Sequence, residues 1–360
     1  MRLINVRFLV MGPVKSILYG IYLYFLLYFI SFLFTDGYNV NILTIAIVTV
    51  DLLSFVIEYF YSNPITRFSI TLSEIIKWLA LMYGMVTFAI YIIQIAIPLP
   101  KYIMLLMYLA VVLVGIYAYI NAHRIIITEH DLEINNLCEE LTIIHISDLH
   151  IGSIRNKKLL TNLINKINSV SADIVIISGD LADGYSSIKE NMFITLKESK
   201  IPIFFVFGNH DYYRGIDPLL KATEIAGIKS IINDKIEFKG LNIFGLPYSF
   251  GNQHEQEETI KKIEKMIDSY QVNILVYHVP INWEFFRSIG FDIQLSGHTH
   301  GGQFYPMTLI FKRAFPYLKG LFKDDNTYLS VTDGVGTGSP PLRLGTHSEI
   351  VLLHLKKSKF

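Results

Sequence analysis

The stretch Gly208-Asn209-His210-Asp211 is the clearest guide to the fold of this sequence. It follows Ile203–Phe207, an apolar run with the length and β-rich composition of a buried strand. A second such stretch, Gly297-His298-Thr299-His300, follows the apolar run Phe291–Ser296. Ligands of open α/β sheets bind beyond the carboxyl ends of the strands. Both stretches therefore predict a binding site at one edge of a sheet.

Three more apolar runs end in the same kind of residue. Asp148 and His150 follow Leu141–Ile146, Asp180 follows Asp173–Ser178, and His278 follows Val272–Tyr277. Carboxylate, amide and imidazole groups suit borderline divalent metals. One ion takes about four to six such ligands, so this set is too large for a single ion. The pattern favours a site that holds two.

The rest of the C-terminal region alternates between helices and strands. We expect helices over Lys157–Ser169, Ile188–Ser199, Asp217–Ala226 and Glu255–Ser269, and further strands near Ile228–Asn233, Leu241–Phe244, Thr327–Thr332 and Glu349–Leu355. Buried strands separated by amphipathic helices indicate a layered α/β fold.

The N-terminal region has a different composition. The 360-residue chain has a mean hydropathy of +0.41, and its first 140 residues hold only 7 of 31 Lys and Arg and 9 of 31 Asp and Glu. A membrane helix needs about 20 apolar residues, and four stretches qualify: Ser16–Phe34, Asn41–Phe60, Ile75–Ile97 and Tyr102–Ile120. We therefore expect a four-span membrane domain over residues 1–120, a polar linker over 121–140 and a soluble domain over 141–360.

Cations flank one side of the expected spans. They are Arg2, Arg7, Lys15, Arg67, Lys77 and Arg124, whereas the opposite loops contain only Lys101. By the positive-inside rule, both termini and the soluble domain of this multi-pass protein are expected in the cytoplasm. Basic and acidic residues balance at 31 each, so no nucleic-acid partner is expected. The single cysteine, Cys138, excludes an intramolecular disulfide.

Two acidic residues fall inside the second expected span. Glu58 is expected to pair with Lys77 at the cytoplasmic ends of neighbouring spans, or to extend towards water. Asp51 lies deeper and has no evident partner. Helix packing and contact with a substrate or ion both remain open for Asp51.

The strand-end residues together resemble the calcineurin-like metallophosphoesterase family. The shared motifs are D-x-H at 148–150, G-D at 179–180, G-N-H-D at 208–211, His278, and G-H-x-H at 297–300. The segments 278–280, 295–303 and 343–355 are similar to its membrane-associated bacterial and archaeal branch. The resemblance covers residues 141–360 and implies a four-layer α/β/β/α sandwich behind the membrane helices.

The same resemblance implies a dinuclear centre and assigns its ligands. Asp148, His150, Asp180 and His300 would bind one ion, while Asp180 as a bridge, Asn209, His278 and His298 would bind the other. Manganese is the expected metal, with iron or zinc as alternatives. His210 would face the substrate and Asp211 would orient its imidazole. A metal-bridged hydroxide would attack phosphorus, and His210 would stabilise the developing charge and protonate the leaving oxygen.

The expected substrate is a phosphodiester or pyrophosphate of a lipid-like molecule in the bilayer, because a hydrolase anchored at the membrane can reach one there. Arg343, on a Gly- and Pro-rich loop, is a candidate contact for the substrate phosphate. The aromatic and basic segment Phe304–Phe322 is either a membrane-interface element or a subdomain covering the site. A soluble phosphoester or nucleotide substrate is the alternative, and a non-catalytic membrane sensor is less favoured. Oligomeric state is left open.

Overall fold

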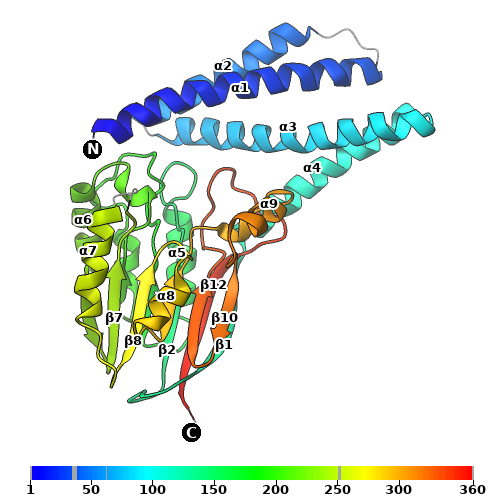
Figure 1. The fold of residues 1–360 in the computed structure, drawn as a ribbon. Helices are drawn as coiled ribbons and strands as arrows, with labels where there is room; N and C mark the ends of the chain where they lie inside the picture. The colour runs from blue at the N-terminus through cyan, green and yellow to red at the C-terminus, as the bar shows by residue number, and fades with distance from the viewer. Residues whose placement is uncertain (1, 35–38, 62, 250–252, 359–360) are drawn as a thin grey trace. The chain divides into compact units, whose positions relative to one another are not determined.

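The computed structural model describes residues 2–34, 39–61, 63–249 and 253–358. The chain divides into two compact units, one of Met1–Ile120 with Ser339–Leu342 and one of Asn121–Gly338 with Arg343–Phe360. The first unit contains helices α1 (Arg2–Phe34), α2 (Val40–Phe60), α3 (Pro64–Ala96) and most of α4 (Lys101–His123) (Figure 1). Each of these helices is long and apolar enough to cross a membrane.

Helix α3 begins earlier than the hydropathy of the sequence predicted. It starts at Pro64 rather than near Ile75, because Asn63 caps its N-terminus. The Asn63 side chain accepts hydrogen bonds from the amides of Ile65 and Thr66, and the Thr66 hydroxyl accepts one from the Asn63 amide. This reciprocal cap stabilises a first turn that is too polar to be recognised by hydropathy.

The polar residues of the membrane helices pair differently from our expectation. Lys77 lies 2.7 Å from Asp51 and 2.8 Å from Glu74, whereas Glu58 accepts a hydrogen bond from Thr66. The predicted Glu58–Lys77 pair is therefore wrong. Asp51 also accepts hydrogen bonds from Ser16 of α1 and Ser73 of α3, so its carboxylate joins three helices. These contacts favour a packing role for Asp51.

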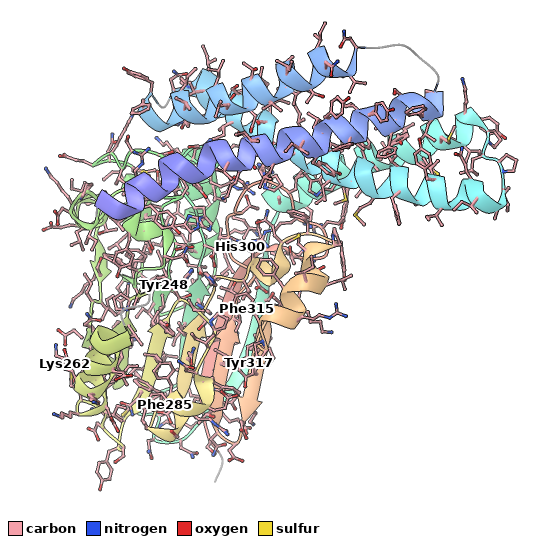
Figure 2. The ribbon with its side chains drawn as sticks, turned by 45° about the horizontal axis from the view of Figure 1, so that its top comes forward. Tyr248, Lys262, Phe285, His300, Phe315 and Tyr317 are labelled. Carbon is pink, nitrogen blue, oxygen red and sulfur yellow. The ribbon has the colours of Figure 1, made fainter. Side chains whose placement is uncertain are left out.

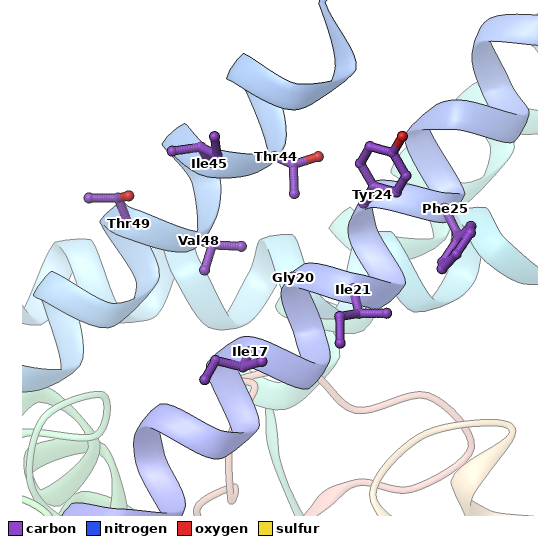
Figure 3. A pocket seen from close by; sticks show the side chains of 9 residues that line it. All are labelled: Ile17, Gly20, Ile21, Tyr24, Phe25, Thr44, Ile45, Val48 and Thr49. Atoms are coloured by element: carbon purple, nitrogen blue, oxygen red, sulfur yellow. The ribbon is translucent and has the colours of Figure 1, made fainter.

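An open groove of about 460 Å³ lies between α1 and α2 (Figure 3). Ile17, Tyr24, Phe25 and Ile45 are among its lining residues. Apart from threonine hydroxyls and the Tyr24 hydroxyl, the lining offers no group for catalysis or metal binding. Such a surface suits contact with other apolar groups.

The second unit contains two six-stranded sheets. One has the order β1 (Ile125–Ile134), β12 (Ser348–Lys357), β2 (Leu141–Ile146), β3 (Ile174–Ile177), β4 (Ile203–Phe205) and β5 (Ile228–Ser230). The other has the order β10 (Gly320–Asp324), β11 (Thr327–Val331), β9 (Ile293–Ser296), β8 (Val272–Tyr277), β7 (Leu241–Leu246) and β6 (Asp234–Phe238).

Alternating side chains of the central strands fill different layers. Ile143 and Ile176 lie in the core shared by the two sheets, whereas Ile144 and Ile177 pack with helices α5 (Lys157–Ile167) and α6 (Ile216–Ile225). On the second sheet, Phe244 packs outward with α7 (Gln253–Glu264) and α8 (Trp283–Ser288). Helix, sheet, sheet and helix therefore form the expected four-layer α/β/β/α sandwich.

Two predicted segments have a different structure. Residues 125–134, expected within a polar linker, form β1 and pair in parallel with β12 from Ile125↔Ser348 to Ile134↔Lys357. The buried side chains of Leu132 and Ile134 join the inter-sheet core. The helix expected over residues 188–199 is replaced by turns and a short 3₁₀ helix, Ile194–Glu198. Cys138, shortly after β1, is exposed.

Candidate metal centre

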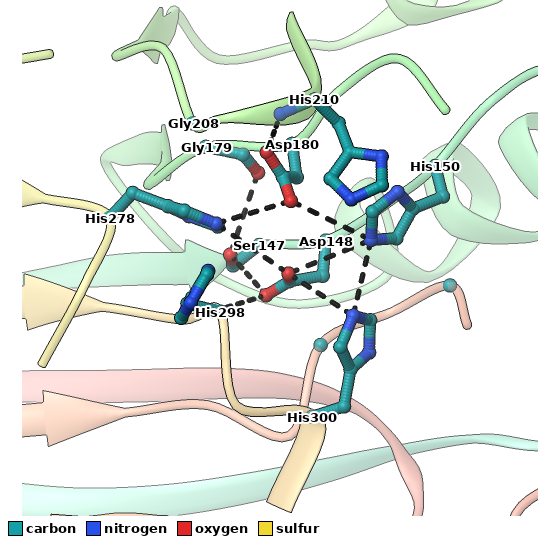
Figure 4. Close-up of polar contacts among 12 residues, drawn as sticks. Ser147, Asp148, His150, Gly179, Asp180, Gly208, His210, His278, His298 and His300 are labelled. Atoms are coloured by element: carbon teal, nitrogen blue, oxygen red, sulfur yellow. Dashed lines mark hydrogen bonds and ion pairs between the residues drawn. The ribbon is translucent and has the colours of Figure 1, made fainter. Parts of the chain in front are cut away.

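The structure brings six of the predicted ligands and His210 together at the carboxyl ends of strands β2, β3, β4, β8 and β9 (Figure 4). The six are Asp148, His150, Asp180, His278, His298 and His300. Five of these residues have backbones in the left-handed region, with φ angles between 46° and 72°: Asp148, His150, Asp180, His298 and His300. This conformation is costly for residues other than glycine, and such strain concentrates at functional sites. Strands β2, β3 and β9 thus end in sharp turns that direct side chains to the cluster.

Glycines allow the strand ends to approach closely. A Cβ at Gly208 would lie 2.2 Å from Asp180 Oδ1, and one at Gly297 would lie 1.9 Å from Ser147 Oγ. Both separations are far inside van der Waals contact, so no larger residue fits without moving the site. The glycines of the G-N-H-D and G-H-x-H motifs are therefore part of the packing of the cluster.

Each central carboxylate uses one oxygen for support and leaves the other to the cluster. Asp148 Oδ2 accepts hydrogen bonds from Ser147 Oγ at 2.6 Å and from the His298 amide at 3.0 Å. Its Oδ1 lies 3.4 Å from His300 Nε2 and 3.7 Å from His150 Nε2. Asp180 Oδ1 accepts from the His210 amide at 2.9 Å, while its Oδ2 lies 3.2 Å from His278 Nε2.

Backbone carbonyls fix two of the imidazoles. His278 Nδ1 donates to the Ser178 carbonyl and His210 Nδ1 donates to the Asp183 carbonyl, both at 2.8 Å. A hydrogen bond of this kind sets the tautomer and leaves Nε2 for a ligand. His145, in contrast, is wholly buried and bonded at both nitrogens to Ser330 and Ser178, as expected for a core histidine.

Among the described residues, three overlapping groups have metal-ligand spacing. They are Asp148, His150 and His300; His150, Asp180 and His210; and Asp180, His278 and His298. The group members' ligand atoms lie within 4.8 Å of one another. Asp180 and His150 each belong to two groups, and of the two only Asp180 is a carboxylate. Asn209 also follows β4, and its Nδ2 donates to the Tyr213 hydroxyl at 3.3 Å.

The donor set fits divalent metal ions. Asp148 Oδ1 and Asn209 Oδ1 are buried and make no hydrogen bond within the described residues. Leaving such oxygens without a partner is costly unless another group supplies the interaction. A divalent cation would satisfy both, and oxygen and imidazole donors suit manganese, iron or zinc.

Burial and the charges of the cluster shift the pKa values of its histidines in opposite directions. Burial lowers the pKa of His300 to about 3 and that of His298 to about 4, so both are neutral near pH 7. Burial alone would lower the pKa of His278, but Asp180 and Asp148 outweigh it and raise that pKa to about 9. Binding of an ion at His278 would therefore release a proton.

The structure corrects the expected role of Asp211. Its carboxylate accepts hydrogen bonds from the amides of Asp180, Gly208 and Ala182 at 2.8–2.9 Å. The His210 ring is held by the Asp183 carbonyl instead. Asp211 therefore ties the loops after β3 and β4 together and does not orient the His210 imidazole.

The structure also corrects the role expected for Arg343. Its side chain is 0% exposed, and its guanidinium donates to backbone carbonyls, including that of His300, and to the Thr346 hydroxyl. A group enclosed by these acceptors does not reach a substrate phosphate. The sequence suggested a site-lining residue because of the Gly- and Pro-rich loop, but the loop directs Arg343 inwards.

Aromatic side chains border the His298 side of the cluster. Tyr248 and Phe315, both labelled in Figure 2, pack on the ring of His298 with centroid distances of 6.4 and 5.8 Å. Phe315 caps helix α9 (Met307–Ala314), which lies within the segment 304–322. Leu309 and Ile310 of α9 are 59% and 56% exposed. The segment thus combines contact with the site and an exposed apolar surface.

Comparisons with known proteins agree with this architecture. Residues 141–302 match the family model described as calcineurin-like phosphoesterase. The chain is 33% identical over 234 residues to an uncharacterised metallophosphoesterase of Helicobacter pylori strain J99, covering 64% of this chain and 63% of that relative. It is 34% identical to YpbG of Bacillus subtilis, covering 60% of this chain and 81% of YpbG.

The name of one vertebrate relative describes it as a transmembrane protein. The chain is 24% identical to the transmembrane protein with metallophosphoesterase domain of Danio rerio, covering 68% of this chain and 60% of the relative. With its layered fold and carboxylate–imidazole cluster, this chain belongs to the calcineurin-like phosphoesterase family. Residues 141–302 form its metallophosphoesterase domain, and the described part of the chain includes four helices long and apolar enough to cross a membrane.

Proposed function

We propose that this protein is anchored in a membrane with its catalytic domain in the cytoplasm and hydrolyses a phosphodiester or pyrophosphate of a lipid-like substrate. The observation that carries the proposal is helix α9. Its exposed Leu309 and Ile310 are followed by the exposed cations Lys312 and Arg313, and its C-cap Phe315 contacts His298. Exposed apolar groups beside cations suit the interface of an anionic bilayer.

The spacing along the chain supports the same proposal. Only Arg124 separates the last residue of α4 from the first residue of β1. A catalytic domain joined this closely to a membrane span is restricted to substrates near the bilayer. A molecule whose acyl chain rests along α9 could present its phosphate to the neighbouring cluster.

In this proposal the seven residues named from the sequence would hold two divalent ions, with manganese as the favoured metal and Asp180 as the ligand that both would share. When bound, the ions would activate a water molecule and neutralise phosphoryl oxygens. Asp148 and Asp180 supply negative charge to the site, and hydrogen bonds from neighbouring groups hold their carboxylates in place. His210, fixed through Nδ1, directs Nε2 to the substrate, and in the imidazolium form its Nε2–H can donate a hydrogen bond and then a proton to the departing oxygen.

An assay of the full chain in detergent with Mn²⁺ tests the reaction. Monoesters, diesters, a phospholipid and a pyrophosphate-linked lipid would be compared at equal concentration. We expect the highest kcat/KM with a lipid-linked diester or pyrophosphate. Preference for a soluble nucleotide would contradict the lipid proposal, and absence of activity on every substrate with Mn²⁺ bound would favour a sensor.

Replacing Leu309 and Ile310 together by Ser tests the role of α9. Because both side chains are exposed, the fold should tolerate the change. We expect kcat/KM on the lipid in vesicles to fall about 10-fold or more, since two apolar anchors are lost, with little change on a soluble diester. Lys262→Ser on α7 is the matched surface control. Equal loss on both substrates would argue against lipid docking.

A further inference from the structure

Arg343 is a buried cation whose guanidinium faces backbone carbonyls. Its Nη2 donates to the carbonyls of Asp333, Gly334 and Gly336, the last two at 3.1 and 2.8 Å. Its Nη1 donates to the His300 carbonyl at 3.3 Å. A buried charge is costly, so a guanidinium spread over this many carbonyls indicates a role in fixing them.

The carbonyls that Arg343 binds belong to, or lie against, segments that carry members of one candidate metal group. His300 is itself a member of that group. The loop 333–336 lies against the backbone of Asp148, another member, because the Val335 amide donates to the Ser147 carbonyl at 2.9 Å and the Gly336 amide donates to the Asp148 carbonyl at 2.8 Å. One guanidinium thus links the turn after β2 to the turn after β9.

Asn121 holds Arg343 from the opposite side. It lies in the last turn of α4, within the same compact unit as the catalytic sheets. Its Nδ2 donates to the carbonyls of Arg343 and Thr346 at 3.0 and 2.9 Å, and its Oδ1 lies 3.1 Å from His347 Nδ1. All the polar atoms of this 8%-exposed side chain are therefore used on the Arg343 loop.

We propose that Arg343 and Asn121 are positioning residues that hold Asp148 and His300 at metal-binding separation. Neither side chain supplies a ligand. Arg343 fixes the carbonyl of one ligand residue and the loop behind the other, and Asn121 fixes the backbone of Arg343. The end of α4 is thereby a structural part of the metal centre. The inference rests on the proposed dinuclear site.

The test uses the full chain in detergent and Mn²⁺ as the probe. The dissociation constant is measured from the electron paramagnetic resonance signal of free Mn²⁺, beside the Tm and the turnover of a soluble diester. Loss of residues that orient metal ligands commonly weakens metal affinity about 10- to 100-fold. We expect a loss of this size in Asn121→Ala and Arg343→Lys, with turnover partly restored by excess Mn²⁺.

Asn168→Ala is the matched control. Asn168 also joins loops through backbone bonds, donating to the Glu198 carbonyl and accepting from the Lys200 amide, both at 2.9 Å. Its substitution should lower Tm without changing Mn²⁺ affinity. If Arg343→Lys does not fold, Asn121→Ala still tests the proposal, because it leaves the guanidinium in place.

The outcomes separate this inference from the proposed function. Wild-type protein that binds no Mn²⁺ overturns the metal centre and this inference together. Wild-type binding with Mn²⁺ affinity unchanged within twofold in folded Asn121→Ala overturns the positioning role alone, whatever the Tm. Weakened affinity in Asn121→Ala but not in Asn168→Ala supports it.

Discussion

Asp148 and Asp180 show how single residues meet two demands at once. One carboxylate oxygen of each accepts hydrogen bonds from neighbouring protein groups, and the other lies among imidazole nitrogens. The first oxygen fixes the side chain, so the second has a defined position before any ion binds. Such preorganisation spares the site the cost of ordering its ligands at each binding event.

Replacing His210 should separate catalysis from metal binding. His210→Asn removes the imidazole nitrogen offered to the substrate but leaves Asp148, Asp180 and His278 in place. We expect kcat to fall about 10²- to 10⁴-fold, the usual contribution of acid–base catalysis, with the bound Mn²⁺ per chain unchanged. Metal analysis and steady-state kinetics measure the two effects. Near-normal kcat would show that His210 has another role.

Residue types and spacing were enough to predict which Asp and His side chains gather at the strand ends, because each follows its strand directly in sequence. That these side chains bind metal stays a prediction. The roles of Asp211 and Arg343 could not be predicted in this way. Asp211 bonds to amides of the loop after β3, and Arg343 bonds to the His300 carbonyl. These partners are 29 to 43 positions away, and only the folded chain identifies them.

Among the elements, β1 shows why an edge strand is difficult to recognise. Its middle residues, Thr128 to Asp131, are polar and half-buried or exposed, so they resemble a linker. Charges at a sheet edge protect it from pairing with other chains. Its partner β12 lies more than 200 residues later, and that pairing is invisible to local pattern. Asp131 and Lys356 then form an ion pair across the two strands at 2.6 Å.

Leu132→Ala tests whether β1 is a structural strand. Leu132 is 0% exposed in the core between the sheets, and such truncations cost about 2–5 kcal/mol. We expect a clearly lower Tm of the catalytic domain, followed by its intrinsic fluorescence on heating. The neighbouring Glu133→Ala, at an exposed position, should leave Tm nearly unchanged. Equal Tm values for the two variants would mean that residues 125–134 do not stabilise the fold.

At the scale of the whole molecule, hydropathy was sufficient to locate four candidate spans, because each is a continuous apolar stretch. The polar contacts among them were mispredicted. Lys77 and Glu58 were expected to pair because both were placed near the cytoplasmic ends of neighbouring spans. Side-chain pairing, however, also depends on the rotation of each helix and on the residue at which α3 begins. The cap at Asn63 places Thr66 beside Glu58, and Lys77 is left to Asp51.

The exposed Cys138 makes the chain its own topological reporter. It is the only thiol in 360 residues and lies in the catalytic unit, so one labelling event reports the side of the membrane on which that unit resides. If the domain is cytoplasmic, a membrane-impermeant maleimide will label Cys138 only after cells are permeabilised. Cys138→Ser, which carries no thiol, defines the background. Labelling in intact cells would place the hydrolase on the outer face and its substrate in the outer leaflet.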